Sequence, residues 1–473
     1  MRALSLRAHL DAALLRRLAD WLVVLIAVVL PWSISATAIC IAAWLLAVLP
    51  SLDLGSVRRE IQSPAGGLPV LLWCLGVTGM LWADVSWTER LQGVGSFHRL
   101  LVIPLLFAQF RESKHGIRVI YGFLISSSIV LIASYILVLN PGLTPPGKSV
   151  GVLVHDDIFQ GSLCVICGFG ALGYAISEAL KRHLPIAFAF GAIAALFFAN
   201  FLFVLVFSRI VLVVAPVLAG FLGWRLSRWK GLVSACTLAV AVSVAFWLSS
   251  PSFRERMHNS MDEVREYSTA NKATPIGQHL AFLRESLTII STAPIIGHGT
   301  GSIPKEFRRV TAGESGAAGV ATINPHNQTF AVAIQIGLVG AIVLWLMWVA
   351  HFRLFHASGL AAWLGTVIVI ENIVSSAVHS HLSDSPHGWL YVFGVGVLGG
   401  MTLQQRTEAI SGGSAKSETC DVAGMIDSSR ERTGIGNARN RRYIKDAPDH
   451  FATAQGFIAP KVMQSSSETR GFQ

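Results

Sequence analysis

The chain has 473 residues, of which 53% are hydrophobic and 14% are charged, and its mean hydropathy is +0.57. Soluble domains carry about 25% charged residues, so this composition excludes an ordinary soluble protein and indicates a membrane protein with many spans. The formal net charge of +10 would suit a nucleic-acid partner, but the basic residues are scattered through short loops and the C-terminal segment. We therefore expect no nucleic-acid partner and attribute the excess to the positive-inside rule.

The chain begins with a basic arm, residues 1–18, and two apolar runs that predict a retained helical hairpin instead of a cleaved signal peptide. Further apolar runs follow along the chain. Together the runs cover about residues 19–34, 36–50, 68–83, 99–110, 117–139, 158–180, 184–207, 210–224, 231–249, 327–350, 359–378 and 388–403. We expect an all-α polytopic membrane protein with about 12 transmembrane helices in one bundle, residues 1–404.

Basic residues in the connecting loops alternate in density along the chain. The loops after the even-numbered runs are rich in basic residues, and the short loops after the odd-numbered runs hold far fewer. The even-numbered loops contain Arg58, Arg59, Arg111, Lys114, Arg118, Lys181, Arg182, Arg225, Arg228, Lys230 and Arg353. Because basic loops stay on the cytoplasmic side, both termini are predicted to be cytoplasmic. Residues 84–98 and 140–157 are predicted as loops on the outer side, together with residues 250–325.

The segment 250–325, between the ninth and tenth runs, is the longest polar stretch within the predicted bundle. Its first part, Phe253 to Tyr267, is charged and predicts a surface helix. Its second part, Gln278 to Ile290, has a helical spacing of apolar residues and carries Arg284. Pro294 and the glycines that follow it predict a turn that ends this helix.

The last segment, residues 405–473, is rich in Ser, Gly, Arg and Asn and has no apolar periodicity. We expect a disordered cytoplasmic tail there. Five of the six cysteines lie inside apolar runs, so we expect free thiols buried in the bundle.

The leading candidates for chemistry are Arg209, Arg284 and His326. Arg209 ends the seventh run on the outer side, where a charge must reach interfacial water or find a partner. His326 follows Pro325 at a junction between loop and helix, where Asn324 or Asn327 can cap the helix. The free N–H groups of a helix start suit an anionic substrate, and an imidazole can accept a proton from a hydroxyl.

Each candidate also has a structural interpretation. Arg209 can snorkel to lipid headgroups, Arg284 can lie on a solvated helix face, and His326 can bond a loop carbonyl. Weaker candidates for the site are Asn327, His298 and Asp157.

Two polar clusters invite a metal interpretation. One is His155-Asp156-Asp157, which opens the sixth run, and the other is the histidine-rich loop between the last two runs, with His379, His381, Asp384 and His387. The first lacks a visible full ligand set and the second is better explained as an exposed polar turn, so we expect no metal and no cofactor. Glu371, inside the eleventh run, serves either function or helix packing.

Three motifs together resemble the O-antigen ligase family of bacterial inner-membrane proteins, which also includes O-antigen polymerases and protein O-oligosaccharyltransferases. They are Phe207-Ser208-Arg209; Arg284 with the later Ala293-Pro294-Ile295-Ile296-Gly297-His298-Gly299; and Pro325-His326-Asn327-Gln328 followed by Gln335-Ile336-Gly337-Leu338-Val339-Gly340. This chain has Gln335 where the family often has Glu, and it lacks the family's Trp after the loop arginine.

The resemblance implies a metal-independent, inverting glycosyltransferase with a periplasmic active site in the bacterial inner membrane. An O-antigen ligase transfers O-antigen polysaccharide from undecaprenyl pyrophosphate to a sugar hydroxyl of the lipid A–core oligosaccharide. Arg209 and Arg284 would then bind the pyrophosphate, and His326 would take the acceptor's proton. The alternatives are an O-antigen polymerase, a protein O-oligosaccharyltransferase and, more distantly, a transporter or flippase.

Overall fold

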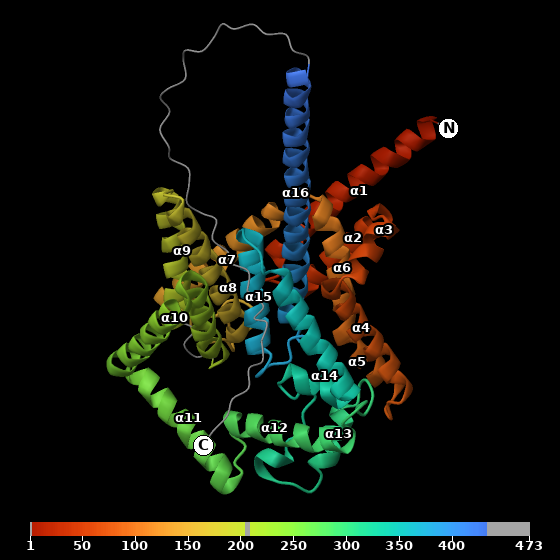
Figure 1. Cartoon of the computed structure of the whole chain (residues 1–473). Coiled ribbons are helices and arrows are strands. Elements are labelled where there is room, and N and C mark those ends of the chain that lie inside the picture. The colour runs from red at the N-terminus through yellow and green to blue at the C-terminus, as the bar shows by residue number, and fades with distance from the viewer. Residues whose placement is uncertain (1, 204–208, 433–473) are drawn as a thin grey trace, which may run out of the picture. The chain divides into compact units, whose positions relative to one another are not determined.

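The computed structural model describes the backbone of residues 2–203 and 209–432, and the side chains of residues 13–202, 212–251 and 253–410 (Figure 1). This part of the chain is helical and contains no strand. Its α-helices are α1 Arg2–Val29, α2 Ile34–Val48, α3 Leu54–Gln62, α4 Pro64–Thr78, α5 Trp87–His98, α6 Val102–Glu112, α7 Gly116–Leu139, α8 Asp157–Leu180, α9 Leu184–Phe203, α10 Arg209–Ser249, α11 Pro251–Ala270, α12 Pro275–Thr292, α13 Ile303–Val310, α14 Gln328–Leu354, α15 Leu360–Ser375 and α16 Ser385–Arg432. The all-α prediction is confirmed.

Eight helical segments of the described residues are long and apolar enough to cross a membrane. They lie at Ile34–Ser51, Pro64–Leu81, Trp87–Glu112, Gly116–Leu139, Asp157–Leu180, Leu184–Leu202, Leu212–Ser249 and Gln328–Leu354. The remaining predicted runs fall in α1, α15 and the first part of α16, and two runs share α10. The chain is therefore a polytopic membrane protein.

Helix α10 is a tight hairpin of two arms. Ser227 (φ −144°) and Arg228 (φ 52°) leave the helical conformation and reverse the chain. The arms touch at Gly223 and Gly231, where a β-carbon on Gly231 would lie 1.9 Å from the carbonyl oxygen of Gly223. The predicted runs 210–224 and 231–249 are these two arms, joined by the predicted basic turn.

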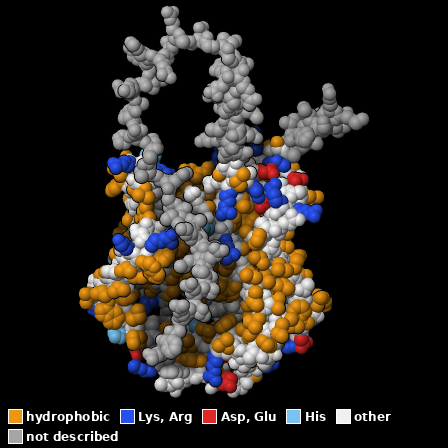
Figure 2. Space-filling model, in the orientation of Figure 1, with side chains coloured by type: hydrophobic (Ala, Val, Ile, Leu, Met, Phe, Trp, Pro, Cys, Tyr) orange, Lys and Arg blue, Asp and Glu red, His pale blue; other side chains and the backbone are white. Residues whose placement is uncertain are grey.

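Wide apolar areas cover the side of the molecule seen in Figure 2, with charged side chains gathered mainly above and below them. On α7, for example, the side chains of Ile125 and Ile132 are 61% and 60% exposed. Exposed apolar surface of this extent is unfavourable in water but favourable against lipid tails. The surface pattern therefore agrees with the composition.

Polar contacts collect the expected outer segments at one end of the bundle. Asp84 pairs with Lys305 of the insertion, and the Trp82 indole donates to the Gly297 carbonyl oxygen at 3.3 Å. At the start of α14, the Gln328 side-chain oxygen accepts the Leu382 N–H at 2.8 Å, and Arg99, which follows α5, donates to the Asp384 carbonyl oxygen at 2.6 Å. The insertion thus contacts the segment before α5, and the start of α14 contacts the loop between α15 and α16.

The basic loops share another set of contacts. Arg111 pairs with Glu60 at 2.9 Å, and Arg16 pairs with Glu112 at 3.3 Å. Arg225 of the α10 turn donates to the Ala357 carbonyl oxygen at 3.1 Å. These contacts join segments that the sequence predicts on the same, basic side of the membrane.

Two sequence predictions of irregular structure differ from what is observed. The expected loop 84–98 is helical from Trp87, because Ser86 and Glu89 form a capping box that starts α5. Helix α16 continues to Arg432, past the expected start of the tail at residue 405, while residues 433–473 lie outside the described part. Residues Met1–Ser411 form one compact unit and Gly412–Gln473 a second, and the description below concerns the first.

Within the insertion, both predicted helices are observed. The charged stretch lies in α11, and the stretch that carries Arg284 lies in α12. A small apolar core, made by Phe282, Ile289, Ile303, Phe307, Ala331 and Ile334, joins α12 and α13 to the first turns of α14. Burying several such side chains supplies about 1.5–3 kcal/mol each, so the insertion is held firmly on the start of α14.

The predicted turn after α12 docks into a break in α14. Gly337 has φ 68° and ψ −165°, a conformation that is essentially restricted to glycine. At this break Leu338 N–H donates to the Pro294 carbonyl oxygen at 2.8 Å, and His298 N–H donates to the Ile334 carbonyl oxygen at 2.8 Å. The two glycine-containing motifs of the sequence therefore complete each other's backbone hydrogen bonds.

Replacing Gly337 by alanine is expected to destabilise the protein by at least about 2 kcal/mol, because of backbone strain alone. The new β-carbon would also lie 2.1 Å from the Ile295 carbonyl oxygen. Thermal unfolding of the purified protein in detergent measures the effect. Gly95→Ala on α5 is the matched control, because its β-carbon would meet nothing within 4 Å. Equal melting temperatures for the two variants would contradict the docking described above.

Candidate functional site

His326 occupies a constrained junction between the insertion and α14. Its φ of 52° is left-handed, which is uncommon for a residue other than glycine. The Asn324 side-chain oxygen accepts the His326 N–H at 2.9 Å, and the Asn327 side-chain oxygen accepts the Phe330 N–H at 3.0 Å. The predicted helix cap is therefore Asn327, and the unusual backbone turns His326 out of the helix direction.

Aromatic rings surround the His326 imidazole. Phe282 of α12 stacks on it at 5.9 Å between centroids with an interplanar angle of 15°. The rings of His279 and His379 lie 4.9 Å and 5.8 Å away, both in edge-on arrangements. Burial, with added repulsion from His279 and His379, lowers the pKa of His326 to about 4. At neutral pH this imidazole is neutral and can accept a hydrogen bond from a hydroxyl.

Two more histidines continue this cluster beyond His379: His381 in the loop between α15 and α16, and His387 in the first turn of α16. The His379 ring lies 5.5 Å from the rings of both His381 and His387, which are themselves 4.5 Å apart. His381 and His387 are 1% and 2% exposed. His379 Nδ1, His381 Nε2 and His387 Nε2 are buried and have no hydrogen-bond partner among the described residues. Buried polar atoms normally have a hydrogen-bond partner, so these nitrogen atoms leave room in the cluster for a bound water as partner.

His387 and Asp384 form an oriented pair at the far side of the cluster. His387 Nδ1 hydrogen-bonds the Asp384 carboxylate. Burial alone would raise the pKa of Asp384, but the hydrogen bond from His387 and the charges of His387, His379 and His155 hold it below its usual value. A carboxylate that fixes one imidazole nitrogen leaves the other directed elsewhere, as in oriented general bases.

Arg284 does not join His326. It lies two residues beyond Phe282, about 160° around α12, and its side chain is exposed. Among the described residues, no side-chain hydrogen bond or ion pair of Arg284 is present. The alternative role predicted for Arg284 is an arginine on a solvated helix face. Its exposure agrees with that role, and it has no carboxylate partner among the described residues.

Two other predicted site residues, Arg209 and Asp157, each lie in the first turn of a helix. Arg209 is the first residue of α10, and its side chain lies outside the described residues. Asp157 opens α8, but the cap of this helix is Asp156, whose carboxylate accepts the Phe159 N–H at 2.7 Å. Phe159 in turn packs edge-on against His387, with 5.1 Å between centroids. The start of α8 therefore borders the histidine cluster through Phe159.

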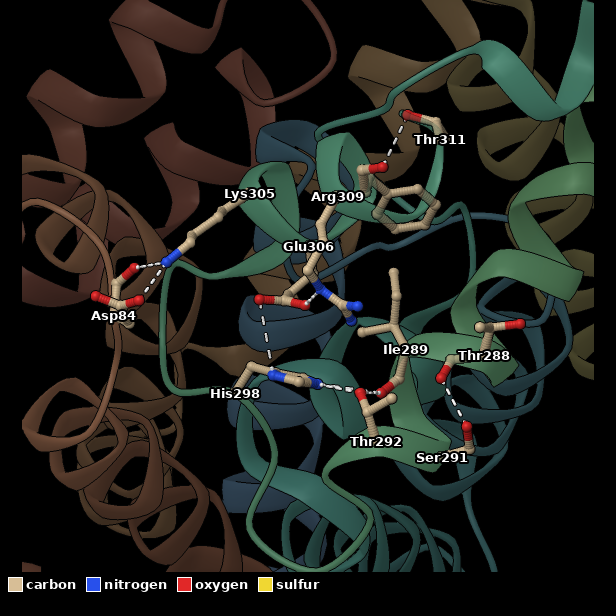
Figure 3. A network of polar contacts seen from close by, with 11 residues as sticks. Asp84, Thr288, Ile289, Ser291, Thr292, His298, Lys305, Glu306, Arg309 and Thr311 are labelled. Carbon is tan, nitrogen blue, oxygen red and sulfur yellow. Dashed lines mark hydrogen bonds and ion pairs between the residues drawn. The ribbon is translucent and has the colours of Figure 1, made fainter. Parts of the chain in front are cut away.

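His298 belongs to a separate polar network in the insertion (Figure 3). Its Nε2 lies 3.0 Å from Thr292 Oγ1 and 3.1 Å from the Ile289 carbonyl oxygen. Its Nδ1 lies 3.7 Å from Glu306, which also binds Arg309 at 2.8 Å. These contacts hold the docked turn against α12 and α13, so His298 has a structural role.

Gln335 also has a structural role. Its side-chain oxygen accepts the Gly301 N–H at 2.8 Å, and its side-chain nitrogen donates to the Ala331 carbonyl oxygen at 2.9 Å. A glutamate could accept the first bond but could not donate the second. In this chain the amide therefore fastens the docked turn with both of its ends.

No group of three or more His, Cys, Asp or Glu among the described residues is arranged to hold a metal ion. The histidine cluster consists of imidazole rings packed against one another. Of the two sequence clusters considered for metal binding, this loop is the one that the fold brings to His326.

Comparison with known proteins assigns the central part of the chain. Residues 192–346 match the model of the family described as "O-Antigen ligase". The chain carries an O-antigen ligase family domain. The matched range contains Arg209, Arg284 and His326, whereas the loop with His379 and His387 lies beyond it. The chain is also 21% identical over 326 residues to the "O-antigen ligase" of Escherichia coli (strain K12), a match that covers 65% of this chain and 74% of that protein.

Sequence analysis did not place the histidine-rich loop in the family domain's site. The signal was present, because several imidazoles in one short outer loop are unusual near a membrane. What the sequence lacked was the distance between that loop and His326, which depends on packing between α14 and α15. Asn327 makes this link directly, since its side-chain nitrogen donates to the Ala377 carbonyl oxygen at 3.0 Å.

Glu285 gives the site a pH-dependent stability. It is 8% exposed, and neither carboxylate oxygen has a hydrogen-bond partner among the described residues. Burial raises its pKa from 4.5 to about 7, against the opposing charge of Arg284. Between these values the folded state holds more protons than the unfolded state, so the free energy of unfolding falls as pH rises.

We therefore expect the melting temperature to decline between about pH 4.5 and pH 7, and Glu285→Gln to flatten this decline. Thermal unfolding in detergent over this pH range provides the measurement. Glu255→Gln, at an exposed position of α11, serves as the control. Parallel curves for wild type and Glu285→Gln would show that Glu285 does not ionise in this window.

Proposed function

We propose that the protein is an O-antigen ligase, which transfers O-antigen polysaccharide from undecaprenyl pyrophosphate to a sugar hydroxyl of the lipid A–core oligosaccharide. The observation that carries the proposal is His326, a neutral, half-buried imidazole at the edge of an insertion, inside the matched family domain. The similarity to the Escherichia coli protein supports the same activity.

The proposed setting is the bacterial inner membrane, crossed about twelve times, with both termini cytoplasmic and the site periplasmic. The convergence of the insertion and the α15–α16 loop at one end supports this topology, as do the basic contacts of Arg111 and Arg225. A lipid-linked donor and a lipid-linked acceptor then both reach the site from the same leaflet.

In the proposed reaction the acceptor oxygen attacks the anomeric carbon of the donor glycan, and the bond to pyrophosphate breaks on the opposite side of the sugar. This inverts the anomeric configuration. Undecaprenyl pyrophosphate leaves with the bonding electron pair. Arg284 is exposed and free of carboxylates, so it is available for phosphate oxygens, together with Arg209.

The acceptor's proton passes first to His326. Because a base with a pKa of about 4 holds a proton weakly, a second acceptor is needed close by. His379 lies next to His326, and the oriented His387–Asp384 pair lies next to His379. We propose this succession of imidazoles, bridged by water, as the route that carries the proton away.

A purified system tests the transfer. With lipid-linked donor and lipid A–core acceptor, we expect product from the wild type and a loss of about 100- to 1000-fold for Arg209→Ala, Arg284→Ala and His326→Ala. Arg265→Ala is the matched control, since this exposed arginine of the insertion lies 3.9 Å from Asp262 and outside the proposed site. Full activity in all three variants would refute the mechanism.

The acceptor supplied separates the related activities. Elongation of the lipid-linked glycan without lipid A–core would indicate a polymerase, and transfer to a protein would indicate an oligosaccharyltransferase. Repeating each reaction with a chelator tests metal independence. Movement of the donor across vesicles without any transfer would favour a flippase.

The proton route has its own test. His379→Ala is expected to lower kcat about 100-fold with KM unchanged, and added imidazole should restore part of the rate. His183→Ala is the control, because this histidine pairs with Glu178 near the basic loops. A structural role for His379 would instead lower the melting temperature and would show no rescue by imidazole.

A further inference from the structure

Two cavities meet beside the basic loop that follows α8. The first, of about 120 Å³, lies between α1, α7, α8, α15 and α16 and is lined by apolar side chains, among them Ile26, Phe123, Phe190 and Phe393. The second, of about 320 Å³, lies at the end of α8 and against α10 and α15. Tyr174 and Leu360 line both cavities. The two spaces are therefore neighbours that share one wall.

The second cavity has two cations in its lining, Lys181 and Arg225. Lys181 pairs with Glu178 at 2.7 Å, and its side chain remains 56% exposed. Arg225 lies 5.6 Å from the Trp363 ring centroid and spends one donor on the Ala357 carbonyl oxygen. A guanidinium has five donors, so both cations keep donors for an incoming anion.

One side of the second cavity is packed tightly around Trp363. The indole N–H donates to the Phe169 carbonyl oxygen at 2.9 Å, and a β-carbon on Gly173 would lie 2.1 Å from the indole nitrogen. The flat indole therefore stays close against α8. Trp363 thus lines the second cavity without filling it, together with Lys181 and Arg225.

Lys181 and the histidine cluster around His326 lie at opposite ends of α8. Phe159, in its first turn, packs against His387 of the histidine cluster, whereas Lys181 follows its last residue. A helix of 24 residues is about 36 Å long, which is enough to cross a membrane's apolar core of about 30 Å. The cavities therefore face the opposite leaflet from the proposed transfer site.

We propose that these two cavities bind one anionic glycerophospholipid, with its phosphate between Lys181 and Arg225 and an acyl chain in the apolar cavity. Charge complementarity favours this occupant: Lys181 pairs with Glu178, whereas Arg225 has no carboxylate partner among the described residues, so the pair keeps an excess positive charge. A headgroup without net charge would add its own cation beside these residues. A soluble anion would leave the adjoining apolar space empty. The proposal does not depend on the transfer activity.

The test uses the full-length protein in detergent, with native mass spectrometry to count bound phosphatidylglycerol and phosphatidylcholine of identical chains. We expect the wild type to prefer phosphatidylglycerol. Each basic residue near an anionic lipid contributes about fivefold in affinity, so Lys181→Gln with Arg225→Gln should weaken binding about 25-fold. Leu364→Trp, which fills the apolar cavity, should weaken both lipids alike.

The double variant Arg228→Gln with Lys230→Gln is the matched control. These residues belong to the same basic loops but line neither cavity, and they remove the same charge. Equal loss in the two double variants would overturn the site in favour of general attraction to the basic surface. Equal binding of the two lipids by the wild type would also overturn it, as would complete displacement by millimolar inorganic phosphate. Melting temperatures confirm that every variant is folded.

Discussion

The docking of the turn after α12 into the broken backbone of α14 is the constraint on which the site depends. Gly337 interrupts the helix, and the freed backbone groups bind residues of the insertion. A further backbone bond, from the Thr300 N–H to the Gly79 carbonyl oxygen at 3.0 Å, also holds the insertion to the bundle. With these contacts, α12 holds Phe282 against His326, and α14 holds His326 against the loop that follows α15. The polar insertion and the apolar bundle thus act as one rigid support.

The fold could be predicted from sequence where one physical signal dominated. Apolar runs and basic loops gave the order of the helices, because lipid and charge act on long segments. The capping box of Ser86 and Glu89 was missed, since a short polar segment between two runs was interpreted as a loop. The two arms of α10 were separated correctly, although their backbone contact depends on Gly223 and Gly231, which lie on different runs.

The site was predicted in part, for a similar reason. The cap at Asn327 follows from residue type and position, and the structure has it. The contact of His326 with His379 joins segments that are far apart in sequence, and no periodicity reports such a distance. Arg284 is predicted to share a site with His326; it lies exposed on α12, two residues beyond Phe282, and its role stays a prediction.

The buried surroundings of His326 have one more consequence. An imidazole with a pKa of about 4 keeps the same charge from about pH 5.5 upward. A site on the outer side of the membrane, as proposed, would meet the pH of the surrounding medium. Across that range His326 stays neutral, so the proposed proton acceptor has the same charge in mildly acidic and in neutral surroundings.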